Sequence, residues 1–300
     1  MTGCQLCPRR CSADRENDRG ACGGGALIRL ARAALHFWEE PCISGTSGSG
    51  AIFFSGCTLR CSYCQNYAIS SGNAGIDITD HRFGEILYEL KAQGAENINL
   101  VTADHYLERV VPILKREKNS LTLPIVYNCS GYESAEMLAL LDGVVDVYLV
   151  DFKYADNALG ETLSGVPDYA DVARAALGTM YRQVGGCVLD ENGMLKSGIL
   201  LRHLVLPGYR KNSLAVLDSV GEILPREEIL LSLMSQFTPN GIAKDPARRL
   251  TRFEYDSVKE RALSLGFRGY FQDFSSQKEE YTPSFLGEGV TKSLTIHDNP

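Results

Sequence analysis

From residue 51 onward, short apolar runs alternate with amphipathic stretches along the chain. Each run has the length of a strand buried in a parallel sheet, and the stretches between the runs place apolar residues at helical spacing. The predicted strands are residues 51–55, 98–102, 124–128, 145–151, 198–206 and 229–234. The predicted helices are residues 82–93, 107–118, 134–141, 169–184, 214–223 and 251–265.

Repeated strand–helix units of this kind indicate an α/β fold with a parallel sheet and right-handed crossovers. Six strands are typical of a partial (β/α)6 barrel. We expect a Cys-rich metal-binding extension over residues 1–48, the barrel over 49–245, and a C-terminal helix and tail over 246–300. Residues 26–38 fit a strand or a helix, residues 44–50 read as a flexible Gly- and Ser-rich joint, and residues 275–300 read as an irregular tail.

Composition excludes several classes of protein. The 300 residues are 44% hydrophobic and 22% charged, which is ordinary for a globular chain. The net charge of −7 gives no sign of a nucleic-acid surface, which would usually be basic. No apolar run approaches the roughly 18 residues of a membrane span, and residues 1–10 show no apolar core of a secretory signal. We therefore expect a cytoplasmic protein that binds neither membrane nor nucleic acid.

Eight of the ten cysteines precede residue 65, and seven of these form two groups, which points to metal or redox chemistry in a reduced compartment. Cys57, Cys61 and Cys64 form a C-x3-C-x2-C motif directly after the first predicted strand. Three thiolates can hold three irons of a four-iron cube and leave the fourth open, as a catalytic site requires. The alternative is a zinc site or incidental thiols, although zinc prefers paired C-x2-C spacing.

A second group of four cysteines lies at the N-terminus: Cys4, Cys7, Cys11 and Cys22. Four thiolates complete the ligand set of one structural zinc or of one auxiliary iron–sulfur cluster, and spacing does not decide between them. The redox character of the neighbouring motif favours a cluster. Nearby arginines would raise its potential and steer an acidic electron donor, or they form a solvated face. Those arginines are Arg9, Arg10, Arg15 and Arg19. The isolated Cys42, Cys129 and Cys187 are expected to be buried thiols.

The stretch from Phe53 to Asn66, FFSGCTLRCSYCQN, resembles the radical S-adenosylmethionine superfamily, and the aromatic residue before the third cysteine, Tyr63, belongs to that resemblance. Within the superfamily, the chain is most similar to proteins related to pyruvate formate-lyase activating enzyme, in particular an uncharacterised group of iron–sulfur proteins named after that activator. The resemblance extends over nearly the whole chain. Its further landmarks are Cys4-x2-Cys7-Pro8-Arg9, residues 39–41, 48–50, 97–102, 126–128, 148–154 and 234–236.

The resemblance implies a radical SAM barrel whose open iron is chelated by S-adenosylmethionine. One electron from the reduced cluster then cleaves the sulfonium to methionine and a 5′-deoxyadenosyl radical, which abstracts a hydrogen atom. The donor of that electron would be a protein such as flavodoxin or ferredoxin. The family's second strand normally ends in Gly-Gly-Glu, whereas this chain has Leu100-Val-Thr-Ala-Asp104 there. A strand-edge carbonyl near Thr102 is expected to accept from the cofactor's ammonium, with Asp104 supplying charge.

Further cofactor contacts are expected at strand ends. Tyr63 and Asn66 come from the cysteine motif, and Asn128 suits the cofactor's carboxylate or ribose, unless it is a turn residue. Asp151 and Lys153 lie two apart and share a face; the matching pair in the activating enzymes lies at cofactor and substrate, and a structural ion pair is the alternative. Of Arg202 and His203, which point to opposite faces, we expect Arg202 inside, because its planar fork suits a carboxylate. Met234 and Gln236 are candidates for the substrate cavity, although for Met234 core packing is the favoured interpretation.

Three functions follow from these features. The first is hydrogen abstraction from a glycine of a partner protein, as an activating enzyme performs, with a shallow, open barrel mouth. The second is the same chemistry on a small molecule or peptide, with an enclosed pocket and an auxiliary cluster. The third is an electron carrier or redox sensor without an open iron. The missing fourth cysteine of the central motif argues against the third.

Overall fold

The computed structural model describes residues 3–72, 74–239, 246–276 and 283–292. Its strands are β1 (Ile28–His36), β2 (Ser49–Phe54), β3 (Ile76–Ile78), β4 (Ile98–Val101), β5 (Ile125–Cys129), β6 (Val147–Asp151), β7 (Val188–Leu189), β8 (Leu195–Leu204), β9 (Leu230–Met234) and β10 (Gly269–Phe271). Its α-helices are α1 (Pro41–Ser44), α2 (Tyr67–Ser70), α3 (Asp80–Ala92), α4 (Leu107–Leu121), α5 (Ala135–Leu141), α6 (Asn157–Ser164), α7 (Tyr169–Val184), α8 (Arg210–Ile223) and α9 (Arg252–Ser264). Short 3-10 helices cover Asp104–Tyr106 and Phe274–Ser276.

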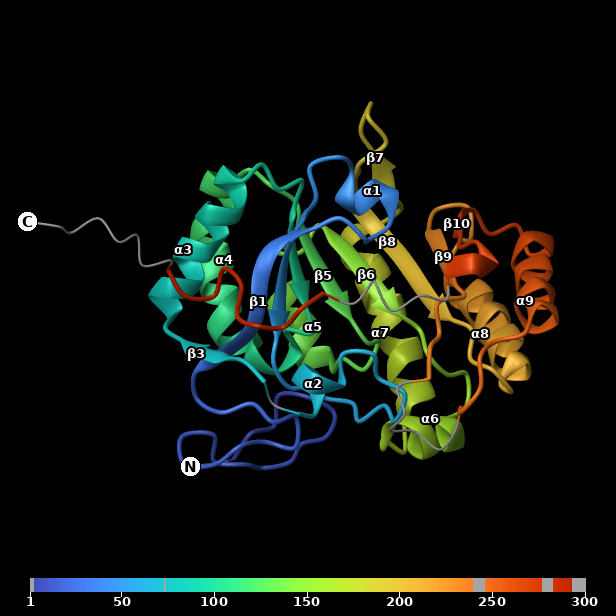
Figure 1. The fold of residues 1–300 in the computed structure, drawn as a ribbon, viewed down its shortest axis with the longest axis horizontal. Helices are drawn as coiled ribbons and strands as arrows, with labels where there is room; N and C mark the ends of the chain where they lie inside the picture. Colours follow the sequence, from blue (N-terminus) through green and yellow to red (C-terminus); the bar gives the residue numbers. More distant parts are fainter. Residues whose placement is uncertain (1–2, 73, 240–245, 277–282, 293–300) are drawn as a thin grey trace, which may run out of the picture.

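The strands form one curved sheet in the order β10-β9-β8-β6-β5-β4-β2-β1-β3, with β7 paired to β8. The six strands predicted from the apolar runs are β2, β4, β5, β6, β8 and β9, and they are parallel neighbours as expected. The helices between them cover one face of the sheet (Figure 1). The prediction of a partial α/β barrel is confirmed, with strands added at both edges.

Alternation along each strand divides the interior into two layers. In β6, Tyr148 and Val150 pack in the large core beneath the helices. Val147 and Leu149 point the other way, into a smaller apolar cluster on the concave face, where Cys42 and Ile43 of α1 cover them. Beyond this apolar cluster, the concave face carries Asp151, the last residue of the strand. The barrel is therefore closed by apolar residues at one end and polar toward the carboxyl ends of its strands.

Both edges of the sheet use segments outside the predicted barrel. The stretch 26–38, which the sequence left undecided, contains β1, which pairs antiparallel with β2. Strand pairing thus crosses residue 48, where the N-terminal extension was expected to end. At the other edge β10, from the expected C-terminal region, pairs parallel with β9. These edge strands were missed because each completes its burial only against the sheet.

The expected flexible joint at residues 44–50 is wrong for its last residues. Ser49 and Gly50 open β2 and are buried. Ser49 Oγ donates to Asn97 Oδ1 at 2.7 Å, and the Gly50 amide donates to the Asn97 carbonyl at 3.0 Å. A Cβ atom at Gly50 would lie 2.7 Å from that carbonyl oxygen. The small residues here allow close approach of two backbones rather than flexibility.

The N-terminal segment lies at the same end of the molecule as α2 and α6, where the barrel strands end (Figure 1). In the expected irregular tail, residues 275–276 belong to the second 3-10 helix, and residues 283–292 contain no helix or strand. It crosses β1 through hydrogen bonds from the Gly287 amide to Ala31 and from the Ala33 amide to Glu288. Residues 277–282 and 293–300 of that tail lie outside the described residues. Within the described part of the chain, no helix is long and apolar enough to cross a membrane.

Candidate active site

A cavity of about 340 Å³ occupies the concave face of the barrel. Cys61 and Cys64 lie in its wall, and polar side chains from five strands and from the turn after β1 converge on it. Its polar lining includes His36, Glu39, Glu40, Asn66, Asn128, Asp151, Lys153, Arg202, Ser232 and Gln236. Its aromatic lining includes Trp38, Phe53, Tyr63, Phe237 and Tyr270. This volume lies at the low end of the range for pockets that hold one drug-sized ligand.

The central cysteines lie on the loop that follows β2, as predicted. The Leu59 amide donates to Cys57 Sγ at 3.4 Å, and Ser70 Oγ donates to Cys64 Sγ at 3.3 Å. Burial raises the pKa of the Cys57 thiol well above its usual range, and the charges of Asp104 and the neighbouring thiols add to this. Burial also raises the pKa of the Cys64 thiol. A metal centre would therefore have to displace the protons of Cys57 and Cys64.

These three thiols fit a four-iron cube with one open iron. Cys61 and Cys64 lie close enough to Cys57 to add to the raised pKa of its thiol. A cube binds each thiolate to a separate iron, so three thiolates leave the fourth iron open. Hydrogen-bond donors already point at the sulfurs, as anionic thiolates require.

A chain of hydroxyl groups ends on Cys61. Ser164 Oγ lies 2.9 Å from Cys61 Sγ, Tyr154 Oη lies 2.7 Å from Ser164 Oγ, and Tyr63 Oη lies 2.6 Å from Tyr154 Oη. A cluster-bound thiolate can only accept, so Ser164 must donate to it. Tyr63, predicted as a cofactor contact, thus lines the cavity and also supports a cysteine through Tyr154.

Replacement of Ser164 by alanine is expected to lower the reduction potential of the centre at Cys61. A hydrogen bond to the sulfur stabilises the reduced, more negative state of the centre. Its removal should therefore lower the reduction potential by on the order of tens of millivolts. Potentiometry followed by electron paramagnetic resonance (EPR) measures the shift. Thr162→Ala is the matched control, since this exposed hydroxyl of α6 only donates to the Ala158 carbonyl. An unchanged potential in Ser164→Ala would refute the role of this hydrogen bond.

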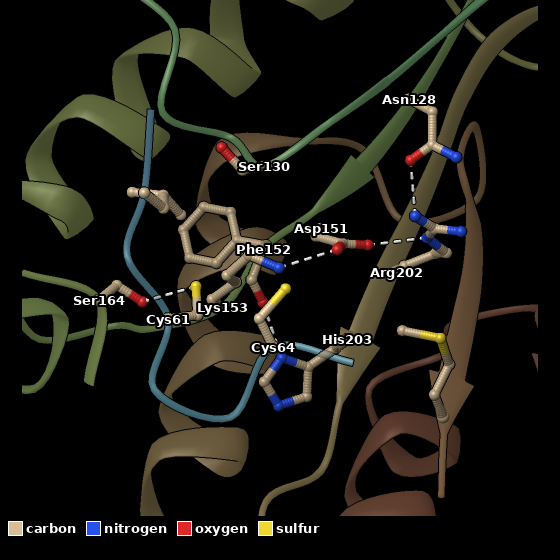
Figure 2. A network of polar contacts seen from close by, with 12 residues as sticks. Cys61, Cys64, Asn128, Ser130, Asp151, Phe152, Lys153, Ser164, Arg202 and His203 are labelled. Atoms are coloured by element: carbon tan, nitrogen blue, oxygen red, sulfur yellow. Dashed lines mark hydrogen bonds and ion pairs between the residues drawn. The ribbon is translucent and has the colours of Figure 1, made fainter. Parts of the chain in front are cut away.

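Arg202 organises the polar wall of the cavity. Its Nε donates to Asp151 Oδ1 at 2.7 Å, its Nη1 to Glu39 Oε2 at 3.0 Å and its Nη2 to Asn128 Oδ1 at 2.6 Å. Figure 2 shows this network running from Asn128 through Arg202 and Asp151 toward Lys153, beside Cys61 and Cys64. His203 points to the opposite face, where its Nδ1 lies 2.7 Å from the Phe152 carbonyl oxygen. Arg202 faces inward as expected, but each of its nitrogens already donates to the protein.

Asp151 and Lys153 form an ion pair, with Lys153 Nζ 2.8 Å from Asp151 Oδ2. Burial opposes ionisation of Asp151, but the charges of Arg202 and Lys153 outweigh it and lower its pKa to about 2. Lys153 also lies near the thiols. Burial raises the pKa of Cys64, and the charge of Lys153 offsets part of this rise. Against burial, the charges of Asp151 and then of Cys61 raise the pKa of Lys153. Both side chains predicted for the site are therefore charged and lie in the cavity wall next to the cysteines.

Glu39 and Glu40 are site residues that sequence reasoning did not select. The Glu39 side chain is 8% exposed and its Oε1 accepts from Asn99 at 3.2 Å and from Asn128 at 3.3 Å. Glu40 Oε2 is buried and has no hydrogen-bond partner among the described residues. Burial raises the pKa of both carboxyls against the charge of Arg202. The available signal was a pair of acidic residues directly after an apolar run, but a strand there was not predicted.

Some of the other predicted site residues line the cavity, and others do not. Asn66, Met234 and Gln236 line the cavity. Thr102 has a left-handed backbone, with φ of 60°, and among the described residues Val101 rather than Thr102 lines the cavity. Asp104 is fully buried and accepts from Thr58 and Tyr127, so its charge does not face the cavity.

Of the three isolated cysteines expected to be buried, Cys42 and Cys129 are buried and Cys187 is half-buried.

Comparisons with known proteins agree with this geometry. The Radical SAM superfamily matches residues 51–177. The uncharacterized protein MJ0674 of Methanocaldococcus jannaschii is 30% identical over 273 residues, which cover 87% of this chain and 73% of that protein. SuiB of Streptococcus suis bound to S-adenosylmethionine matches with a TM-score of 0.51 and 11% identity over 77% of this chain and 52% of SuiB. SuiB bound to the precursor peptide SuiA matches with a TM-score of 0.50 and 12% identity over 73% of this chain and 48% of SuiB.

The chain spans about half the length of the SuiB structures, and the low identity to them shows a shared fold alone. The superfamily match begins in β2 and includes all three central cysteines. The match to the M. jannaschii protein extends the relationship over most of the chain. Together, these observations show that the chain belongs to the radical SAM superfamily.

Proposed function

We propose that this protein is an iron–sulfur enzyme that reductively cleaves S-adenosylmethionine and uses the resulting radical to abstract a hydrogen atom. The proposal rests on the cavity beside the cysteines. Cys61 and Cys64 line a cavity large enough for one ligand, and a carboxylate oxygen in its wall has no hydrogen-bond partner among the described residues. S-adenosylmethionine is a cation with an ammonium group, which suits such a carboxylate. When bound, the [4Fe-4S] cluster supplies the electron that breaks the sulfonium carbon–sulfur bond.

The side chains around the cavity bind the ligand and orient it. Glu40 accepts from a cationic group of the ligand, and a strand-edge carbonyl near Thr102, where Val101 lines the cavity, remains a proposed acceptor for its ammonium. Asn128, Tyr63 and Asn66 supply neutral polar contacts. Lys153 offsets the negative charge of the thiolates, and Asp151 holds it there. Arg202, whose nitrogens already donate to the protein, fixes Asp151 and Asn128 in position rather than gripping the cofactor's carboxylate.

The proposed substrate is a glycine of a partner protein, in the manner of an activating enzyme. A cavity of about 340 Å³ is filled by one ligand and leaves little enclosed space for a second. The target would therefore approach from the open end. One observation favours the alternative of a small molecule or peptide: the N-terminal cysteines pack against the central cysteine loop, as an auxiliary cluster would. We also propose a cytoplasmic location and a flavodoxin or ferredoxin as electron donor.

Cleavage of S-adenosylmethionine tests the reaction. Anaerobically reconstituted protein reduced with dithionite is expected to form 5′-deoxyadenosine and methionine in equal amounts, measured by mass spectrometry. The EPR signal of the reduced centre is expected to change when S-adenosylmethionine is added, because the cofactor binds the open iron. Iron-loaded protein that forms no 5′-deoxyadenosine would instead be an electron carrier or a redox sensor.

Isotope transfer tests the substrate class. Extract from cells grown on α-deuterated glycine is separated into macromolecular and dialysable fractions. A glycine target on a protein predicts deuterium in 5′-deoxyadenosine only with the macromolecular fraction, because the abstracted atom comes from the glycine α-carbon. Deuterium transfer from the dialysable fraction alone would instead support a small-molecule substrate.

A further inference from the structure

The four N-terminal cysteines come together in the fold. Cys7 and Cys22 are buried, while Cys4 and Cys11 are half-buried. A Cβ atom at Gly20 would lie 3.3 Å from Cys22 Sγ and 3.5 Å from Cys11 Sγ, so these two sulfurs flank the same glycine. The thiols of Cys4 and Cys22 both raise the pKa of Cys7, after burial, which places them nearby. The Gly24 amide donates to Cys22 Sγ at 3.4 Å.

Their position favours a cluster over zinc. Four thiolates complete the ligand set of either centre. These four lie beside Cys57, Cys61 and Cys64, the thiols of the proposed catalytic cluster. A second redox centre can exchange electrons with that cluster, whereas zinc has no redox chemistry.

The N-terminal segment is joined directly to the catalytic loop. The Cys57 amide donates to the Cys22 carbonyl at 2.9 Å, so one hydrogen bond links a ligand of each group. Gly56, with φ of 96°, permits this approach, since a Cβ atom there would lie 2.5 Å from the Cys22 carbonyl oxygen. Arg60 donates to the Ala21 carbonyl and reinforces the contact.

Arg9 bridges the two loops and has an unused donor. It follows Cys7 by two residues, and its Nε donates to the carbonyl of Thr58, the residue after Cys57. Its Nη2 is buried and has no hydrogen-bond partner among the described residues. A buried guanidinium nitrogen without an acceptor is costly, and an anionic cluster at either cysteine group would supply one.

We propose that Cys4, Cys7, Cys11 and Cys22 hold a second iron–sulfur cluster that relays electrons to the catalytic cluster. This relay rests on the proposed cleavage of S-adenosylmethionine. A reduced flavodoxin or ferredoxin is oxidised by one electron, which reduces the N-terminal cluster and passes from it to the catalytic cluster. There it breaks the sulfonium carbon–sulfur bond, giving methionine and the 5′-deoxyadenosyl radical. The hydrogen-bonded pair Cys22 and Cys57 lies on the direct path between the two groups.

Metal content of the full chain tests the site. Anaerobically prepared protein is expected to contain about eight irons per chain and no zinc, as two four-iron clusters require. A variant with Cys57, Cys61 and Cys64 all replaced by alanine should keep about four irons, with an EPR signal that S-adenosylmethionine leaves unchanged. About four irons with one zinc, or four irons alone, in the wild-type chain would overturn the second cluster.

The relay is tested by comparing two reductants. In the variant Cys4→Ser/Cys11→Ser, the ratio of the flavodoxin-driven rate of 5′-deoxyadenosine formation to the dithionite-driven rate should fall at least tenfold. These cysteines are half-buried, and Cys187→Ser is the control for loss of a thiol elsewhere. An unchanged ratio would overturn the relay. Wild-type protein with eight irons but no cleavage under dithionite would refute the proposed function and leave the second cluster standing.

Arg9 offers a finer test of the contact between the loops. Arg9→Gln should lower the potential of at least one cluster, because it removes a positive charge and a donor at the junction. Arg182→Gln is the matched control, since this exposed arginine of α7 contacts Thr179 and neither cysteine group. Equal potentials in both variants and the wild type would contradict a role of Arg9 at the clusters.

Discussion

The Cys61→Ala variant is expected to lose all detectable cleavage of S-adenosylmethionine and most of the iron bound at the central site. Cys61 is one of only three thiols on the loop after β2, and a four-iron cube with its open position cannot lose another ligand. Cys61 also lines the cavity, so its loss disrupts the centre where the cofactor would bind. Iron content and 5′-deoxyadenosine formation under dithionite measure the two effects.

The matched control is Cys187→Ala. This half-buried thiol donates to the Ile199 carbonyl at 3.1 Å and does not line the cavity described above. Its replacement should leave iron content and turnover near those of the wild type. Turnover by Cys61→Ala equal to that of Cys187→Ala would show that the catalytic centre has been placed on the wrong cysteines.

The Arg202→Met variant is expected to lose roughly 3–5 kcal/mol of folding free energy. Arg202 pairs with Glu39 and Asp151, whose side chains are 8% and 25% exposed. Its removal leaves Glu39 without its cation and leaves Asp151 paired with Lys153 alone. A loss of this size should lower the melting temperature by roughly 5–10 °C. Cleavage of S-adenosylmethionine should fall as well, since Asp151 and Asn128 lose the group that positions them.

The stability deficit of Arg202→Met should narrow as the pH falls from 7 to 4. In the wild type, Asp151 has its pKa lowered to about 2, so its contribution is present above the unfolded value of 3.8 and is lost only below it. In the variant, the buried carboxyls lose the charge that lowers their pKa values, so they take up protons and become neutral at higher pH. Unfolding measured across this range checks the sign.

Two further variants separate the causes. Arg182→Met, an exposed arginine of α7, should change stability by no more than about 0.5 kcal/mol. The double variant Glu39→Gln/Arg202→Met should recover part of the loss, because it removes the unpaired charge. A single Arg202→Met variant as stable as Arg182→Met would show that the network does not support the barrel.

The six barrel strands were predictable because each is buried on both faces and reads as a continuous apolar run, from residues 51–55 to 229–234. The helices that follow them were predictable from their period, although α3 and α8 begin earlier than expected. The edge strands β1, β3 and β10 were not, because they are short or mixed in polarity and are stabilised by pairing with the sheet. The small helix α6, which supplies Ser164, was missed because its eight residues, NALGETLS, include a glycine and few apolar positions.

The site divides in the same way. The cysteine spacing, the inward position of Arg202 and the pairing of Asp151 with Lys153 follow from local rules of spacing and alternation. Glu39 and Glu40 follow β1, and Ser164 is the last residue of α6. These residues reach the site only when the sheet curves. Their roles depend on burial and on partners distant in sequence, which no local pattern records.

By itself, the sequence determined the parallel barrel, the three-cysteine loop at the end of its first strand and the gathering of four more cysteines ahead of it, since period and spacing are local properties. Only the tertiary structure decided that the guanidinium of Arg202 donates hydrogen bonds to Glu39, Asp151 and Asn128. It alone brought Cys22 against Cys57, across 35 residues of chain. Such contacts are made by the closing of the sheet, because hydrogen bonds and ion pairs in a low-dielectric interior are set by which distant groups the fold makes neighbours.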